Sequence, residues 1–229
     1  MSVRGGERRW IFSQLGKNRA CCTPSQSSRI CEHKKKGSFI KMSFSKIPSS
    51  ASGGLLNLGM FVQGAEVVVG ATSYRADFHG KMKLQLEPNK LSQFLGGVIS
   101  QIPLLIQELA WDGVGNIIGP ITVRKDPDRN PPQSTLKGIV SGRSFPAVQD
   151  MVLSIHVTIS NLLPGITLRS KISPNPGPAI LRNSNVTNFP PQNDVYNLVE
   201  PMELEDVNNP GPVLATIRSF PLTVNPATP

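Results

Sequence analysis

Residues 150–172 read DMVLSIHVTISNLLPGITLRSKI. From Met151 to Ser160 the residues of one parity are all apolar, whereas polar residues dominate the other, and β-branched residues are frequent. This period of two is typical of a half-buried β-strand. A Leu-Leu-Pro-Gly break follows at 162–165, and a second alternation runs from Ile166 to Ile172. The two alternating runs predict an antiparallel hairpin.

Further short alternating runs lie on both sides of this hairpin, separated by turn sequences rich in Pro, Asn, Asp and Gly. We expect strands at residues 67–69, 74–87, 117–124, 135–141, 195–199, 202–207 and 213–224. Many short strands at such spacing predict a mainly β fold, an antiparallel β-sandwich or barrel-like domain.

The period changes once, between residues 89 and 111. Apolar residues there recur at steps of three and four, from Leu91 and Phe94 to Leu109. This spacing predicts an amphipathic helical segment over 89–111 that covers one end of the sheet, with a kink or break at Pro103. The stretch is long enough to span a membrane, but its glutamines, Glu108 and Pro103 argue against a transmembrane segment.

The positive charge of the chain is concentrated at its N-terminus. The 229 residues carry 24 basic and 15 acidic groups, a net +9. Residues 1–41 hold ten basic and two acidic groups, so the other 188 residues hold 14 and 13, a net +1. We therefore divide the chain into a basic arm (1–41), a flexible lead-in (42–59) and a single β-rich domain (60–226).

Three explanations of the arm remain open. Clustered Arg and Lys residues could bind nucleic acid, as in capsid-like proteins that package RNA. The arm could be a targeting segment, although polar residues interrupt its short apolar run. Translation could instead start at Met42, because the codons of Lys34–Gly37 resemble a bacterial ribosome-binding site; we favour this explanation. The nucleic-acid-binding candidates are Arg4, Arg8, Arg9, Lys34, Lys35 and Lys36.

Cysteine and signal patterns add little to this division. Cys21, Cys22 and Cys31 all lie in the arm, and with His33 they match no familiar zinc spacing. Residues 42–65 resemble a secretion signal only loosely, because Asn57 and a serine-rich run interrupt them. A start at Met42 favours a cytoplasmic location, and a working signal would favour secretion.

Two groups of residues are candidate metal ligands. His79 and His156 both fall on the polar parity of their strands, so they could share a metal ion in an enzyme if those strands pair. Glu203, Glu205 and Asp206 lie in an acidic run of the kind that supplies oxygen ligands to calcium, although the run is not an EF-hand loop.

Motifs for nucleophilic catalysis and phosphate binding are absent from the sequence. We therefore expect a protein without enzymatic activity and without a cofactor: a non-catalytic binding or interaction module that contacts a protein or a small apolar ligand. Its polar sheet face or an apolar groove beside the helical segment would form the contact. Two alternatives remain, a nucleic-acid-binding protein that uses the arm and a metal-dependent enzyme that uses His79 and His156.

Overall fold

Thirteen β-strands and one helix make up the part of the chain that the computed structural model describes, residues 54–171 and 178–227. The elements are β1 (Leu55–Val69), β2 (Thr72–Gln85), α1 (Pro88–Leu95), β3 (Gln101–Gly115), β4 (Gly119–Lys125), β5 (Ser134–Gly138), β6 (Ala147–Leu153), β7 (Ile155–Ile159), β8 (Thr167–Ser170), β9 (Ala179–Val186), β10 (Asp194–Leu198), β11 (Met202–Asp206), β12 (Val213–Ser219) and β13 (Leu222–Pro226). All strand pairings among these residues are antiparallel, and they join the strands into one sheet.

The pairings close two rings of strands that share β1, β2 and β3. Ring A runs β1-β2-β3-β4-β7-β8-β11-β12 and returns to β1. Ring B runs β1-β2-β3-β5-β6-β9-β10-β13 and also returns to β1. Closure leaves few unpaired edges, which protects a β-rich chain from pairing with other chains.

The shared strands are long because each serves both rings. β1 pairs with β13 through residues 58–62 and with β12 through residues 66–69. β3 pairs with β5 through residues 101–104 and with β4 through residues 110–115. After β4 the chain alternates between the rings, so that β5–β6 and β9–β10 are hairpins of ring B, and β7–β8 and β11–β12 are hairpins of ring A.

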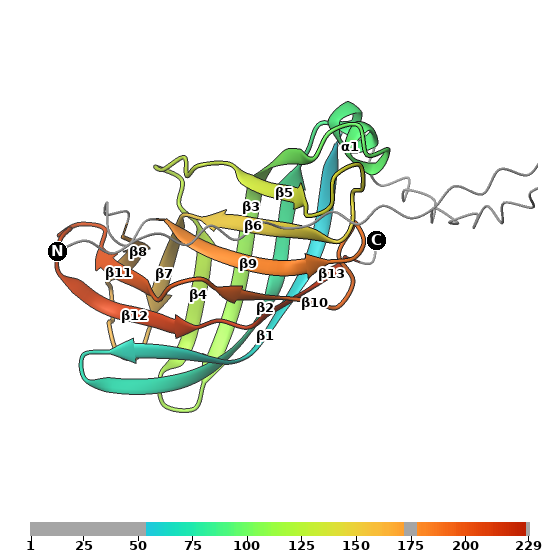
Figure 1. Cartoon of the computed structure of the whole chain (residues 1–229). Helices are drawn as coiled ribbons and strands as arrows, with labels where there is room; N and C mark the ends of the chain where they lie inside the picture. Colours follow the sequence, from blue (N-terminus) through green and yellow to red (C-terminus); the bar gives the residue numbers. More distant parts are fainter. Residues whose placement is uncertain (1–53, 172–177, 228–229) are drawn as a thin grey trace, which may run out of the picture. The chain divides into compact units, whose positions relative to one another are not determined.

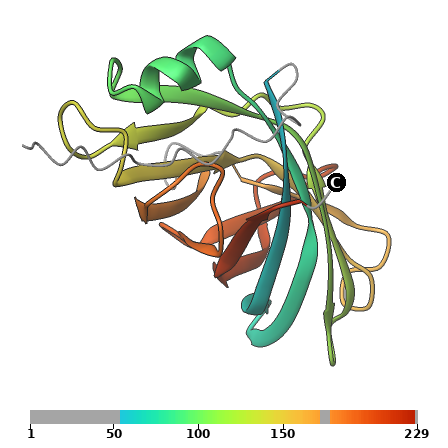
Figure 2. The same ribbon diagram turned by 90° about the vertical axis from the view of Figure 1, so that its right-hand side faces the viewer.

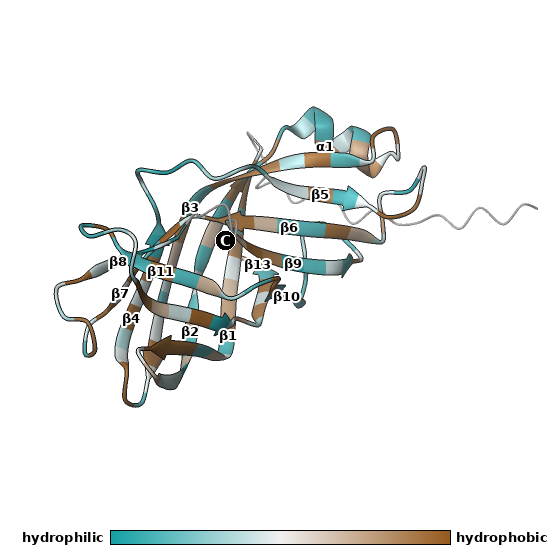
Figure 3. Cartoon of the chain, turned by 60° about the vertical axis from the view of Figure 1, so that its left-hand side comes forward, coloured by the Kyte–Doolittle hydropathy of each residue, from teal (hydrophilic) through white to brown (hydrophobic). Residues whose placement is uncertain are grey.

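Figure 1 shows the shared strands upright, with β5, β6, β9 and β10 running across them. Figure 2 shows the same crossing from the side, with α1 above one end of ring B. Along the strands, hydrophobic and hydrophilic residues alternate (Figure 3), which gives each strand one buried and one exposed face. Leu136, Leu181 and Leu222 fill ring B, and Val157, Ile159 and Leu204 fill ring A.

Three aromatic side chains pack together in the core that the two rings share. Phe220, between β12 and β13, stacks on Trp111 with ring centroids 5.1 Å apart and lies 5.3 Å from Phe78. Glycines in the paired positions leave room for these rings, since Gly80 pairs with Trp111 and Gly113 with Phe78. A Cβ atom at Gly113 would lie 2.5 Å from the Phe78 ring. The packing of these aromatic rings therefore depends on glycine in the facing strand.

The mainly β, antiparallel fold that the sequence predicts is confirmed. The hairpin is confirmed as β7–β8, in which His156 pairs with Arg169. The expected strand 151–160 is wrong in one respect, because it is interrupted at Ser154: β6 belongs to ring B and β7 to ring A. The alternation continues across the break because the odd-numbered residues are buried both in β6 and in β7.

The predicted helical segment over 89–111 is wrong for its second half. Only Pro88–Leu95 form a helix, and residues 101–111 belong to β3. The register of β3 against β2 shifts by one residue between Ile106 and Glu108, so Gln107 is an extra residue. This β-bulge puts buried Ile106 and Leu109 three positions apart, which imitates helical spacing in the sequence.

The helix α1 does cover one end of the sheet, as expected, with Leu91 and Phe94 buried in the core. The Ser144 hydroxyl donates to the carbonyl of Phe94 at 2.6 Å and ties α1 to the β5–β6 connection.

Residues 55–59, assigned to a lead-in from the sequence, are instead part of β1. The arm (1–41) and the rest of the lead-in up to residue 53 lie outside the described residues. Within the described residues, no helix has the length and apolar character needed to cross a membrane.

Candidate functional site

The chain passes between the two rings at a row of connections that we call the seam. It includes residues 126–133 between β4 and β5, Ser154 between β6 and β7, and residues 199–201 between β10 and β11. Ladder hydrogen bonds end where strands part, so buried backbone groups there need other partners. Ser134 Oγ accepts from the Val152 N–H at 2.9 Å, and Ser170 Oγ accepts from the Ile155 N–H at 3.1 Å.

A buried carboxylate lies at the centre of the seam. Asp126, which is 1% exposed, follows β4, and its N–H donates to the carbonyl of Ser154 at 2.9 Å. Its Oδ1 accepts from the N–H of Asp128 at 2.9 Å and lies 3.2 Å from Nε2 of His156 on β7. One ligand atom from each of Asp126, Asp128 and His156 lies within 4.8 Å of the others. The seam thus brings together two carboxylates and one imidazole.

Arg129 links this group to a third carboxylate, that of Glu205. Its Nε lies 3.9 Å from Asp126 Oδ2, its Nη1 donates to the Ser170 carbonyl at 2.8 Å, and its Nη2 lies 3.4 Å from Glu205 Oε1. Arg169 Nε donates to Glu205 Oε1 at 2.9 Å, and the Gly211 N–H donates to Oε2 at 3.0 Å. Burial alone would raise the pKa of Glu205, but these hydrogen bonds and the two guanidinium charges lower it below its usual value.

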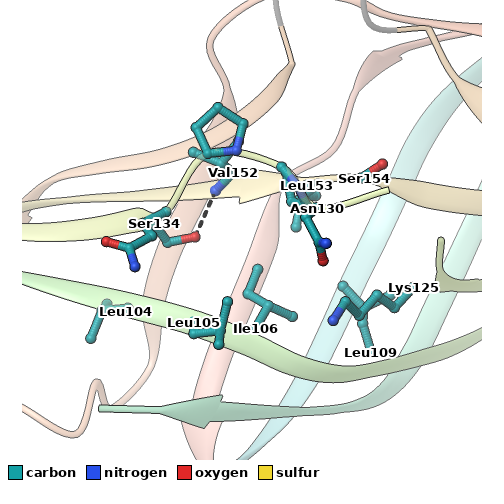
Figure 4. Close-up of a pocket in the computed structure, with 13 residues that line it drawn as sticks. Leu104, Leu105, Ile106, Leu109, Lys125, Asn130, Ser134, Val152, Leu153 and Ser154 are labelled. Atoms are coloured by element: carbon teal, nitrogen blue, oxygen red, sulfur yellow. Dashed lines mark hydrogen bonds between the residues drawn. The ribbon is translucent and has the colours of Figure 1, made fainter. Parts of the chain in front are cut away.

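Two pockets open on the seam. The first, of about 40 Å³, lies between β3 and the residues 130–133 that lead into β5 (Figure 4). Leucines and Ile106 of β3 form one wall, and Val152, Leu153 and Ser154 face them. A space of this volume holds only one or two water molecules.

The second pocket is larger, about 190 Å³, and lies between the ends of β8 and β9 and the connection from β10 to β11. Its lining is mostly apolar and includes Lys171 and two glutamates: Lys171, Pro178, Ala179, Ile180, Val199, Glu200, Pro201, Met202 and Glu203. Lys171 Nζ donates to the Gly211 carbonyl at 3.0 Å and lies 3.8 Å from Glu203 Oε2. At this distance the ion pair between Lys171 and Glu203 is weak. Glu200 forms no ion pair within the described residues.

Ring B also contains a buried polar pair. The Tyr196 hydroxyl on β10 donates to Gln149 Oε1 on β6 at 2.7 Å, and both side chains are fully buried. Burial, and to a lesser degree the charge of Asp194, raises the pKa of Tyr196. The contact fastens two strands across the interior of the ring, since β9 lies between them.

The two histidines proposed as shared metal ligands lie apart. β3 and β4 separate β2, which carries His79, from β7, which carries His156. Three steps between neighbouring strands, at about 4.8 Å each, are too long for one metal ion to bridge. The partners of His156 are instead Asp126 and Asp128. The sequence marks these two only as turn residues around Pro127, and nothing local shows that β4 pairs with β7.

The acidic run does not form one ligand group in the structure. Glu203 lies beside Lys171, Glu205 binds two arginines, and Asp206 Oδ1 accepts from the N–H of Asn208 at 2.9 Å.

The nucleic-acid-binding candidates Arg4, Arg8, Arg9, Lys34, Lys35 and Lys36 lie outside the described residues. The sequence also suggests an apolar groove beside the helical segment. Val98 and Ile139 are exposed there, but both pockets described above lie on the seam and not beside α1.

No protein-family model and no curated protein matches the chain. A solved structure is similar in fold, that of DynF from the dynemicin biosynthesis pathway of Micromonospora chersina, with a TM-score of 0.61 and 20% identity. The match covers 76% of this chain and 81% of DynF. At this identity the similarity concerns the barrel-like β fold.

Proposed function

We propose that this chain is a non-catalytic binding protein whose larger seam pocket takes a small ligand with an apolar body and a cationic amine. The observation that carries the proposal is the pocket of about 190 Å³, whose lining includes the apolar residues Ile180, Val199 and Met202 and the acidic residues Glu200 and Glu203. The fold similarity to DynF assigns no ligand and no pathway.

The volume sets the size of the ligand. An apolar cavity of about 150 Å³ binds benzene in a protein interior. A pocket of about 190 Å³ therefore suits a single substituted ring or an aliphatic body of similar size. Release of water from the apolar lining favours binding by about 25 cal/mol for each Å² of apolar surface buried.

The charge of the lining sets the preferred head group. Two glutamates face one lysine, so the lining carries 1 − 2 = −1. Lys171 already donates to Gly211, and Glu203 keeps an open side because its ion pair is long. A ligand ammonium group can pair with Glu203 or Glu200, whereas a ligand carboxylate would be repelled.

Three probes with the same body and different charge test the proposal: benzylamine, benzyl alcohol and benzoate. We expect the full chain to bind benzylamine about two- to fivefold more tightly than benzyl alcohol, as for a partly exposed ion pair, and benzoate most weakly. Ligand-observed NMR titration measures the three affinities. Glu203→Gln should reduce the preference for benzylamine, while Glu87→Gln, which changes a Glu–Lys pair next to α1, should leave it intact.

Ala179→Leu supplies the steric test, because Ala179 lines the pocket and is nearly buried. The added carbons should weaken all three probes together, with circular dichroism confirming that the fold is kept. The proposal fails if the probes bind equally to wild type and Ala179→Leu, or if benzoate is the preferred probe.

A further inference from the structure

The group formed by Asp126, Asp128 and His156 has the composition of a metal site. Imidazole and carboxylate ligands bind divalent first-row metals such as zinc at about 2.0–2.2 Å. Ligand atoms around a tetrahedral ion of that size lie roughly 3.3–3.5 Å apart, by the same bond lengths. Asp126 Oδ1 and His156 Nε2 are already 3.2 Å apart, and the third ligand atom lies within 4.8 Å of both.

The hydrogen bonding of His156 gives a second indication. Its Nε2 is buried and makes no hydrogen bond of acceptable geometry within the described structure, although it points toward Asp126 Oδ1. A buried nitrogen that lacks a hydrogen bond lowers stability. Coordination of a cation between Nε2 and the two carboxylates would use this nitrogen.

The backbone holds the two aspartates in place for such a site. The N–H of Asp128 donates to Asp126 Oδ1, which closes a tight turn and leaves that oxygen a second lone pair. Asp126 is fixed by burial and by its backbone bond to Ser154, and Ser154 Oγ lies 3.5 Å from its Oδ2. Asp128 is exposed, so solvent has access to the group from its side.

The surrounding charges allow a cation. Arg124 and Arg169 pair with His156 across the sheet, and Arg129 approaches Asp126. Asp112 binds Arg124, and Glu205 binds the other two arginines. The three arginines therefore face four carboxylates, those of Asp112, Asp126, Asp128 and Glu205, for a net 3 − 4 = −1. Arg129 approaches Oδ2 of Asp126, whereas His156 approaches Oδ1.

We propose that Asp126, Asp128 and His156 bind one divalent first-row transition-metal ion that fastens the β4–β5 connection to β7. The site differs from the larger seam pocket, with which it shares no residue, and from the pairing of His79 with His156 that the sequence indicates. With three protein ligands, the ion keeps at least one coordination position for water.

The test uses Zn²⁺ and the full chain with Cys21, Cys22 and Cys31 changed to Ser, so that thiolates cannot bind the metal. Isothermal titration calorimetry should show one Zn²⁺ bound in the parent protein. His156→Gln and Asp128→Asn should each weaken this binding more than about tenfold, because each removes a direct ligand. Zn²⁺ should also raise the melting temperature of the parent and not that of His156→Gln.

Two matched variants control for general losses of histidine and acid. His79→Gln removes the other histidine of the described residues, and Asp206→Asn changes an aspartate that makes the same turn contact as Asp126. Both should bind Zn²⁺ as the parent does. The proposal is overturned if the folded parent binds no Zn²⁺, or if His156→Gln and Asp128→Asn bind it with unchanged affinity.

Discussion

Glu205 is the carboxylate on which two arginines converge, Arg169 of ring A and Arg129 of the seam. It is 5% exposed and accepts hydrogen bonds from Arg169 and from the backbone of Gly211. These contacts favour its charged form, which is why its pKa lies below the usual value despite burial. Removing one partner of a buried ion pair leaves the other charges uncompensated.

We expect Glu205→Gln to lower the free energy of unfolding at pH 7 by about 2 kcal/mol, less than for a fully buried pair, because Arg169 and Arg129 keep some contact with water. Since the folded pKa is depressed, this stabilisation is present above the unfolded pKa of about 4.3 and is lost as the pH falls through the folded value. Urea denaturation at pH 3–7 should therefore show the difference between wild type and Glu205→Gln narrowing at acid pH.

Glu203→Gln is the comparison for this prediction, because its carboxylate lies on the same strand but 3.8 Å from its lysine and partly in solvent. It should change stability by less than about 1 kcal/mol. A difference between wild type and Glu205→Gln that stays constant down to pH 3 would contradict the assigned role of the carboxylate charge.

At the scale of elements, β2 and β3 fit together because glycines face aromatic residues. A Cβ atom at Gly80 would meet the carbonyl of Ala110 and lie 2.7 Å from Cα and Cδ1 of Trp111. We expect Gly80→Ala to destabilise the protein by about 1–3 kcal/mol, as overpacking does elsewhere. Gly59, on β1, is the control, since its nearest neighbour would be 3.9 Å away.

Gly59→Ala should be neutral or slightly stabilising, because alanine restricts the unfolded chain more than glycine does. Urea denaturation of the two variants gives the comparison. Equal stabilities would mean that the Trp111 side chain and backbone can move aside at low cost, which would contradict the close packing described for Trp111 and Gly80.

The strands show how far the sequence determines this architecture. The alternation over 74–87 predicts β2 to within two residues at each end. It fails over 101–111, because one bulged residue, Gln107, is enough to convert a period of two into apparent helical spacing. The alternation also continues through Ser154 and so gives no sign that β6 ends there. The reason is that odd-numbered residues are buried in both β6 and β7.

The candidate metal site depends on information of another kind. His156 stands out in the sequence as a histidine in a strong strand, but its partners lie 28 and 30 positions earlier. Asp126 and Asp128 meet it because β4 pairs with β7 and places Arg124 beside His156. Pairing between distant strands is set by the closure of the rings, which no local pattern encodes.

For the whole molecule, the sharing of β1, β2 and β3 predicts that the rings unfold together. Leu136→Ala, a fully buried change in ring B, should cost about 2–4 kcal/mol. We expect it to lower the amide-exchange protection of β7 and β8 in ring A as much as that of β5 and β6 in ring B. Exchange measured by mass spectrometry at peptide resolution tests this.

Val157→Ala, buried in ring A, is the reciprocal variant and should reduce protection in both rings in the same way. Loss of protection confined to the ring that carries the change would show that the rings behave as separate cooperative units. That result would contradict the structural argument from the shared strands.

Ring closure also has a consequence for synthesis on the ribosome. Ring A closes only when β12 reaches β1, and ring B only when β13 does, so both rings wait for residues 213–226. Until those residues leave the exit tunnel, the edge of β1 that pairs with β12 and β13 stays open, and neither ring can close around its core. Such contacts between distant segments form slowly, and the unfinished chain is exposed to aggregation meanwhile. Chaperone binding to ribosome-bound chains should therefore persist until the last two strands emerge.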